Sequence, residues 1–258
     1  MKTVLTIAGF DPSGGAGILA DIKTISRFDC YGVAVITSVT FQNTMGVFGA
    51  NHQTADSITR QLRAILDDFD LAAVKIGMLP TREAVQAVAE AFSSRSTHLV
   101  VDPVITSSSG FHLIDDAACS SIVEHLFPIA TVVTPNIKEA EKITGTRVRD
   151  RQQMEQAARQ IQALGAHSVL VTGGDLEQDQ AFDLLLDHEL VEYSAPRVEG
   201  KDTHGTGCAF SSALACLLAS GHSLRESVPI AKQYVVDAIK GAPGLGHGRG
   251  PMDHFLRR

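Results

Sequence analysis

Short apolar runs alternate along the chain with segments in which apolar residues recur every three or four positions. The short runs are rich in Val, Ile and Leu, so they predict strands, and the spaced pattern predicts helices. The expected strands are residues 4–9, 33–40, 73–78, 99–104, 131–135 and 169–172. The helical spacing is clearest at Ile18, Ile22 and Ile25, and again at Met154, Ala157, Ala158, Ile161 and Leu164. This alternation predicts an α/β fold with a mostly parallel central sheet and helices on both faces.

Several local signals add boundaries to this pattern. Asp150 followed by Gln153, and Ser223 followed by Glu226, predict helix starts with capping-box chemistry. Residues 182–187 and 190–196 predict a small β-hairpin that is added to the sheet. No internal repeat and no linker interrupts the chain, so we expect a single domain over residues 1–258.

Composition narrows the partners. The chain has 258 residues and a formal net charge of −7, and no run of Lys and Arg exceeds two residues, which argues against nucleic acid or an acidic membrane as partner. A small-molecule substrate is therefore the expected partner. No apolar run approaches the roughly 20 residues of a membrane span, so we expect a soluble protein. The four cysteines form no CxxC pair, and the first residues lack the layout of a signal peptide. We therefore expect a reduced, cytoplasmic protein.

Polar and glycine-rich segments follow five of the expected strands, namely residues 9–17, 41–44, 77–79, 102–104 and 135–136. In an open α/β sheet, ligands bind beyond the carboxyl ends of the strands, so these segments are expected at one surface. Neither the P-loop spacing nor the dinucleotide spacing of glycines is present, which excludes those two nucleotide-binding motifs.

The segment GKDTHGTGC, residues 200–208, leads directly into a small, apolar helix that we expect over residues 209–221. A glycine-rich turn that opens a helix directs unpaired N–H groups at one point and favours an anion there. Cys208 at that point is a candidate base, held partly as thiolate, with Gly205 and Gly207 forming the anion site. The alternative is that both glycines only make a tight turn and that Cys208 is a core residue.

Four other groups of residues carry two interpretations each. Asp21, near the apolar Ile18 and Ile22, either faces solvent or holds a ligand's donor groups. The amide of Gln42 suits a planar nitrogen heterocycle, or it caps a loop. Met78 is an apolar wall for a flat ring, or plain core. Asn136 and Glu139, three apart at a helix start, hold hydrated Mg²⁺ near phosphates, or Asn136 is an ordinary N-cap.

In order, the motifs AGFDPSGGAG (8–17), QNT (42–44), KIGML (75–79), DPV (102–104), TPN (134–136) and THGTGC (203–208) closely resemble those of the hydroxymethylpyrimidine and phosphomethylpyrimidine kinases of thiamine biosynthesis. These enzymes belong to the ribokinase-like superfamily, and the resemblance extends to residues 246–251. It implies phosphorylation of the hydroxymethyl group of 4-amino-5-hydroxymethyl-2-methylpyrimidine with ATP and Mg²⁺, followed in many members by phosphorylation of the monophosphate. It also implies a homodimer.

The resemblance assigns roles to particular residues. The implied ring-binding residues are Gly9, Asp21, Gln42, Met78 and Val104. The implied anion hole and base are Gly205, Gly207 and Cys208. The implied nucleotide residues are Asn136, Thr172 and Gly174, and Glu139 is the implied metal residue.

Three positions depart from the pattern expected of bifunctional members. Ser108 and Thr172 stand where many relatives carry Lys, and Phe41 is bulkier than expected beside the ring pocket. The monophosphate brings about two negative charges beside ATP, so loss of positive charge should slow the second phosphorylation more than the first. Pyridoxal or pyridoxine kinase activity remains an alternative, and a non-catalytic vitamin-binding protein is a second one.

Overall fold

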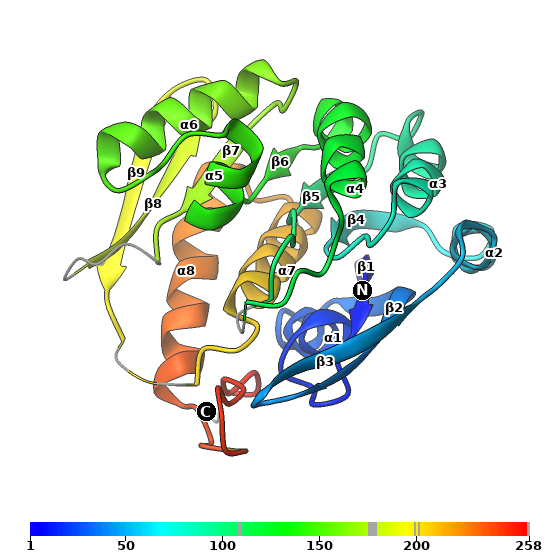
Figure 1. Ribbon diagram of the computed structural model, residues 1–258, viewed down its shortest axis with the longest axis horizontal. Helices are drawn as coiled ribbons and strands as arrows, with labels where there is room; N and C mark the ends of the chain where they lie inside the picture. The colour runs from blue at the N-terminus through cyan, green and yellow to red at the C-terminus, as the bar shows by residue number, and fades with distance from the viewer. Residues whose placement is uncertain (108–109, 175–179, 199, 201, 257–258) are drawn as a thin grey trace.

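A computed structural model describes residues 1–107, 110–174, 180–198, 200 and 202–256 (Figure 1). Within these residues nine strands form one sheet in the order β3-β2-β1-β4-β5-β6-β7-β8-β9. The strands are β1 (Thr3–Phe10), β2 (Tyr31–Asn43), β3 (Gly46–His52), β4 (Leu71–Ile76), β5 (His98–Val101), β6 (Val132–Val133), β7 (Val169–Thr172), β8 (Gln180–Leu186) and β9 (Leu190–Pro196). Strands β1, β2 and β4 to β7 are parallel, whereas β3, β8 and β9 run antiparallel to their neighbours. The expected α/β architecture with a mostly parallel sheet is confirmed.

Helices cover both faces of the sheet (Figure 1). They are α1 (Gly17–Arg27), α2 (Ala55–Leu66), α3 (Arg82–Phe92), α4 (Asp116–Ser121), η1 (Ile122–Leu126), η2 (Phe127–Ile129), α5 (Ile137–Thr144), α6 (Arg151–Ala163), α7 (Thr206–Ala219) and α8 (Leu224–Lys240). Helices α1, α7 and α8 pack in one apolar core, and α2 to α6 pack in the other. Successive strand residues enter opposite cores, as Val4 and Leu5 do in β1, because side chains alternate across a strand. None of the described helices is long and apolar enough to cross a bilayer.

The strand order explains where the ligand cavity described below lies in the sheet. The chain runs from β1 outward to β2 and β3, then returns to the other side of β1 at β4. The direction of winding therefore changes between β1 and β4, and the crevice at such a switch point is where α/β sheets bind ligands. The loops after β1, β4 and β5 all open there.

The sequence located most elements, but several bounds differ; β6, for example, has only Val132–Val133 where residues 131–135 were expected. Strand β5 ends at Val101, because Asp102-Pro103 cannot continue a ladder, although the apolar pattern extended to residue 104. Strand β3 was not predicted, since GVFGANH contains two glycines and no regular alternation. The expected hairpin is β8 and β9, and α7 begins at Thr206, three residues before its apolar stretch.

Both expected helix starts are present. Ser223 and Glu226 form a complete capping box at α8. At α6, the Asp150 side chain accepts a hydrogen bond from the Gln153 amide, as expected, but the Gln153 side chain accepts from the Arg149 amide instead.

Candidate functional site

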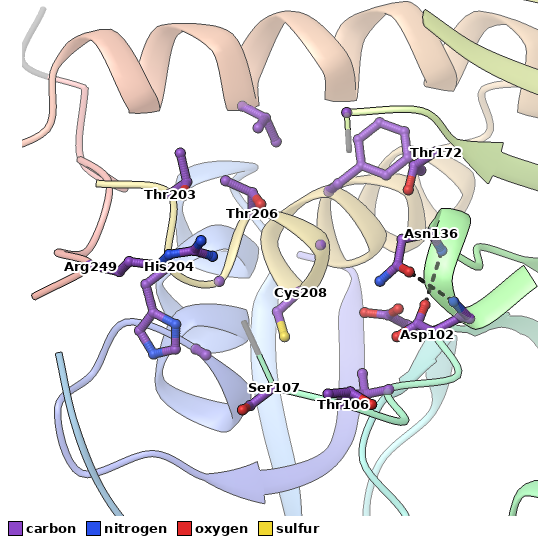
Figure 2. A pocket seen from close by; sticks show the side chains of 18 of the residues that line it. Asp102, Thr106, Ser107, Asn136, Thr172, Thr203, His204, Thr206, Cys208 and Arg249 are labelled. Carbon is purple, nitrogen blue, oxygen red and sulfur yellow. Dashed lines mark hydrogen bonds between the residues drawn. The ribbon is translucent and has the colours of Figure 1, made fainter. Parts of the chain in front are cut away.

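A cavity of about 900 Å³ opens at the carboxyl ends of the central strands. Its walls come from the loops after β1, β4 and β5, from the ends of β2 and β7, and from the start of α7 (Figure 2). All but one of the residues to which the resemblance assigns a role line it: Gly9, Gln42, Met78, Val104, Asn136, Glu139, Thr172, Gly174, Gly205, Gly207 and Cys208. The exception is Asp21. Ser108, where a lysine was expected, lies outside the described residues.

The N-terminal turn of α7 faces this cavity. Gly205 has φ +81, and a Cβ at this position would overlap the carbonyl oxygen of Gly15, so the turn requires glycine. Ala209 donates the first backbone hydrogen bond within the helix, to Gly205 at 2.9 Å. The N–H groups of residues 206–208 consequently have no carbonyl partner inside the helix and can bind an anion.

The half-buried thiol of Cys208 lies at this turn. Burial raises its pKa to about 12, although the nearby Lys75 ammonium acts in the opposite direction. At pH 7 a pKa of about 12 leaves about 10⁻⁵ of the thiol ionised. The expectation of a partial thiolate is therefore wrong for the ligand-free protein, because desolvation outweighs the favourable charges around the sulfur.

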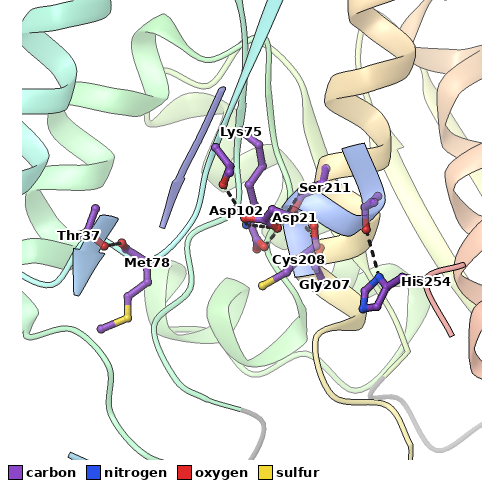
Figure 3. A network of polar contacts seen from close by, with 12 residues as sticks. Asp21, Thr37, Lys75, Met78, Asp102, Gly207, Cys208, Ser211 and His254 are labelled. Atoms are coloured by element: carbon purple, nitrogen blue, oxygen red, sulfur yellow. Dashed lines mark hydrogen bonds and ion pairs between the residues drawn. The ribbon is translucent and has the colours of Figure 1, made fainter. Parts of the chain in front are cut away.

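Asp21 lies beneath Cys208 in a buried polar network (Figure 3). Its carboxylate is fully buried and accepts hydrogen bonds from Thr6 Oγ1 at 2.6 Å and Ser212 Oγ at 2.8 Å. Lys75 Nζ lies 3.0 Å from Asp21 Oδ2, and this side chain is also fully buried. Both interpretations of Asp21 from the sequence are corrected: it neither faces solvent nor reaches a ligand, but neutralises a lysine under the site.

Asp102 is the second carboxylate near this network, and it lines the cavity. Ser211 Oγ donates to its Oδ2 at 3.1 Å. Burial raises the pKa of Asp102 to about 6, despite the opposing charge of Lys75. The group is thus mostly ionised at neutral pH and can accept a proton or hydrogen bonds from a ligand.

His204 connects the glycine-rich turn after β1 to the ring-binding side of the cavity. Its Nε2 lies 2.9 Å from Asp11 Oδ2 and 2.9 Å from the amide group of Gln42. In the structure Gln42 Nε2 faces His204 and Gln42 Oε1 faces Thr40. Because an ionised carboxylate only accepts, His204 Nε2 must carry a proton, so we assign the Gln42 amide the opposite way round, with its oxygen toward His204. Gln42 then directs its NH₂ group toward Thr40 Oγ1, at 3.2 Å, and the cavity.

Asp11 also organises the loop before α1. It accepts hydrogen bonds from Ser13 N at 2.8 Å and Ala16 N at 2.9 Å. Burial alone would raise the pKa of Asp11, but the bonds from His204 and Ser13 outweigh it and the pKa is lowered. An ionised Asp11 therefore holds both the glycine-rich loop and His204.

The apolar part of the cavity wall is close to Gly9. A Cβ on Gly9 would lie 3.0 Å from Met78 Sδ, so a side chain there would crowd the methionine. Thr37 Oγ1 donates to the Met78 carbonyl at 2.6 Å and fixes that loop. Phe41, expected to reshape the ring pocket, does not line the cavity but is half exposed on the outer side of β2.

Asn136 and Glu139 line the opposite end of the cavity. Asn136 caps α5, and Glu139 Oε2 accepts from the Asn136 amide at 2.9 Å, which completes a capping box. Glu139 Oε1 accepts from Ile105 N at 3.4 Å. Each carboxylate oxygen can accept more than one hydrogen bond, so this buried carboxylate still fits a hydrated Mg²⁺. No cluster of three or more His, Cys, Asp or Glu occurs within the described part of the chain.

Thr172 and the glycine turn after β7 lie at the same end of the cavity as Asn136 and Glu139. Thr172 N donates to Pro135 O at 3.0 Å and pairs with Asn136 in a parallel bridge. Gly173 N donates to Asp183 Oδ1 at 3.1 Å, and Lys232 Nζ donates to Asp183 Oδ2 at 2.7 Å. The buried Lys232–Asp183 pair therefore holds the turn that precedes Gly174.

Sequence reasoning missed five cavity residues: Asp11, Lys75, Asp102, His204 and Arg249. All five were within motifs that were noted, but none was assigned a role. The position of Asp102 directly after a strand was a usable signal. The pairing of Lys75 with Asp21 and of His204 with Asp11 depends on tertiary contacts that no spacing reports.

Comparisons with known proteins agree with this geometry. A sequence model for the family described as phosphomethylpyrimidine kinase matches residues 11–253. A hydroxymethylpyrimidine/phosphomethylpyrimidine kinase of Rhizobium meliloti is 44% identical over 257 residues, covering 98% of this chain and 97% of that protein. A thiamine biosynthesis bifunctional protein of Geobacter sulfurreducens, ThiED, is also 44% identical, and the chain spans 52% of its length.

Solved structures show the same fold. A pyridoxal kinase of Bacillus subtilis in complex with ADP has a TM-score of 0.90 and 34% identity, with 98% of this chain and 97% of that chain covered. A phosphomethylpyrimidine kinase of Clostridium difficile has a TM-score of 0.81 and 38% identity, with 93% and 100% covered.

Proposed function

The chain belongs to the phosphomethylpyrimidine kinase family, and from this premise we propose that it transfers the γ-phosphoryl group of ATP to the hydroxymethyl group of 4-amino-5-hydroxymethyl-2-methylpyrimidine, and then to the resulting monophosphate. One observation carries this proposal. In one cavity the anion-binding start of α7 lies between two subsites: a side lined by polar and apolar side chains that suit a ring, and the glycine turn after β7. The product serves thiamine biosynthesis, the pathway that the name of the Geobacter sulfurreducens relative states for that protein.

We assign the ring to the side of the cavity formed by Gly9, Gln42, Met78 and Val104. The Gln42 NH₂ group offers a hydrogen-bond donor to a ring nitrogen, while the Gly9 backbone offers further polar contacts. Met78 and Val104 supply apolar surface for the two faces of a flat ring. His204 positions Gln42 through the hydrogen bond at 2.9 Å.

The reacting oxygen is placed at the start of α7. The N–H groups of residues 206–208 stabilise the transferring phosphoryl group, and Gly205 and Gly207 leave room for it. Phosphoryl transfer proceeds through a loose transition state, so the alcohol loses its proton late. We propose that Cys208 accepts this proton in its minor thiolate form, which the Lys75 ammonium favours.

The nucleotide is assigned to the other end, at Asn136, Thr172 and Gly174, with Glu139 toward the metal. A bound Mg²⁺ would neutralise phosphate charge during the transfer. Solved relatives of the pyridoxal kinase group contain ADP or AMP-PCP, which supports ATP as the phosphoryl donor here.

A pyridoxal kinase activity is the second candidate, because a structural relative with a TM-score of 0.90 carries that name. Pyridoxal is also a flat nitrogen ring with a primary alcohol. A non-catalytic vitamin-binding protein is disfavoured, since such a protein has no use for a thiol at an anion-binding helix start.

One assay separates these functions. ADP release is measured with Mg²⁺ and, in turn, hydroxymethylpyrimidine, its monophosphate, pyridoxal and pyridoxine. We expect the highest kcat/KM with hydroxymethylpyrimidine. Preference for pyridoxal would favour the second candidate, and no ADP release with any ring would contradict a kinase.

We further propose a single-domain, cytoplasmic homodimer. Four free cysteines are consistent with a reducing compartment. The hairpin of β2 and the edge strand β3 exposes Phe41, Met45 in its turn, and Phe48, which is 69% exposed. A second copy would cover such an apolar edge. Sedimentation equilibrium tests the dimer: Phe48→Glu should produce monomers, whereas the exposed Leu164→Glu on the far end of the sheet should not.

A further inference from the structure

The segment after α8 folds back over the cavity. Arg249 N donates to Thr44 O at 2.8 Å, and Gly248 N donates to Thr44 Oγ1 at 3.2 Å. On the other side, His204 N donates to Gly250 O at 3.2 Å. The Arg249 backbone is consequently fixed between the β2–β3 turn and the residues that lead into α7.

The glycines on either side of Arg249 make this packing possible. A Cβ on Gly248 would overlap Thr44 O, and a Cβ on Gly250 would overlap Asp202 Oδ1. Further along, Met252 and His254 are buried, and Thr24 Oγ1 lies 3.3 Å from His254 Nδ1. Arg249 is the only residue of 248–250 with a side chain, so this anchored turn brings one guanidinium to the cavity.

Arg249 lies at the acceptor end of the cavity. Figure 2 shows it beside Thr203 and His204, on the opposite side of Cys208 from Asn136 and Thr172. His204 in turn contacts Gln42 of the ring subsite. The guanidinium and the start of α7 therefore place positive charge on the same side of the reacting centre.

Among the described residues, six Lys and Arg side chains line the cavity, and three of those six pair with carboxylates. Lys75 pairs with Asp21, Lys142 with Asp116 and Lys232 with Asp183. The sequence also lacks the lysines expected at Ser108 and Thr172. A dianionic acceptor placed next to ATP requires positive charge from another part of the chain.

We propose that Arg249 determines specificity for the phosphorylated acceptor, by binding the phosphate of the pyrimidine monophosphate. This deepens the proposed function and rests on it. In the second transfer a phosphate oxygen of the monophosphate forms a bond to the γ-phosphorus, the bond to the β–γ bridging oxygen breaks, and ADP leaves with the electron pair. The acceptor carries about two negative charges and loses no proton, so its binding depends on cations and not on a base.

Arginine suits this task because its planar fork donates two parallel hydrogen bonds to phosphate and keeps its charge at every working pH. The alcohol has no phosphate to bind and gains little from the same group. Arg249 should thus affect the monophosphate far more than the alcohol.

The test uses product inhibition, because the monophosphate is the product of the first transfer. The inhibition constant of the monophosphate against the alcohol, and the KM of the alcohol, are measured for wild type, Arg249→Gln, Arg249→Lys and the exposed control Arg147→Gln. We expect Arg249→Gln to raise the inhibition constant about ten- to hundredfold and to leave the alcohol KM within about twofold. The inhibition constant of Arg249→Lys should lie between those of wild type and Arg249→Gln, and that of Arg147→Gln should equal the wild-type value.

Two results would overturn the proposal: an unchanged inhibition constant in Arg249→Gln, or an equal rise in the alcohol KM, which would give Arg249 a structural role. Failure of the proposed function is distinguished by a separate result, namely no ADP release from the alcohol in wild type. In that event isothermal titration calorimetry measures the affinity of wild type and of Arg249→Gln for the monophosphate. Equal affinities would refute the proposal that Arg249 binds its phosphate.

Discussion

Lys75 Nζ and Asp21 Oδ2 form an ion pair at 3.0 Å in which both side chains are completely buried. Burial alone would lower the pKa of Lys75, but the Asp21 carboxylate outweighs it and the pKa is raised. The pair lies near Cys208, so the buried ammonium adjoins the anion site with its charge balanced by Asp21 (Figure 3).

Removing one partner of this pair should destabilise the protein strongly. Lys75→Met leaves the Asp21 carboxylate buried without its counter-charge, and we expect the free energy of unfolding to fall by about 3–5 kcal/mol. The double variant Lys75→Met/Asp21→Asn should recover at least half of that loss. Urea unfolding at pH 7 measures both. Asp56→Asn, which removes the exposed pair with Arg60, serves as the control and should cost less than about 1 kcal/mol. No recovery in the double variant would contradict charge compensation.

Gln42 should recognise the ring. Removing its amide leaves a buried ring nitrogen unpaired, at a cost of about 1–3 kcal/mol, which is roughly a ten- to hundredfold loss of affinity. Gln42→Ala should therefore lower kcat/KM for hydroxymethylpyrimidine by that factor and leave the KM of ATP nearly unchanged. Gln86→Ala, on the exposed side of α3, is the matched control. Equal effects on ring and nucleotide would refute the assignment.

The pH dependence should reveal the proton acceptor. With the pKa of Cys208 at about 12, the thiolate fraction grows tenfold per pH unit, so kcat/KM for the alcohol should rise steadily from pH 7 to 9. Cys208→Ala should lose about 10² of the activity together with this rise. A wild-type profile that is flat above pH 7 and falls only near pH 6 would instead identify Asp102, whose pKa is about 6.

His254 should make the protein less stable in acid. Burial lowers its pKa to about 4 from the ordinary value of 6.5. Between these values the unfolded chain binds a proton that the folded protein does not, so the free energy of unfolding decreases as pH falls, by about 3 kcal/mol in full. Urea unfolding at pH 7, 5.5 and 4.5 should show a shallower decrease for His254→Asn than for wild type. The exposed His188→Gln should retain the wild-type slope. Parallel slopes for wild type and His254→Asn would contradict this linkage.

The parallel sheet was predictable because its strands are continuous apolar runs, such as VLV in β7, bounded by glycine and polar residues. Strand β3 was not, because it gains its hydrogen bonds from β2 and has weak patterning of its own. Because Phe41 pairs with β3 and is half exposed, it does not shape the ring pocket as the sequence had suggested.

The cavity residues were largely predictable as a group, since the carboxyl ends of parallel strands share one edge. Their individual partners were not. Asp21 looked available for a ligand because its sequence neighbours are apolar, whereas its actual partner Lys75 is 54 residues away. Likewise, a helix start suggested an ionised Cys208, but the sequence does not report the burial that keeps the thiol protonated.

The fold-back of residues 248–250 onto Thr44 has a consequence for protein synthesis. The described sheet draws its strands from residues 3–196, whereas α7 and α8, which cover one of its apolar faces, follow later in the chain. Arg249 reaches the cavity only after α8 has emerged and docked. The last residues to leave the ribosome therefore complete both this second core and the cavity, so catalytic competence requires synthesis of nearly the whole chain.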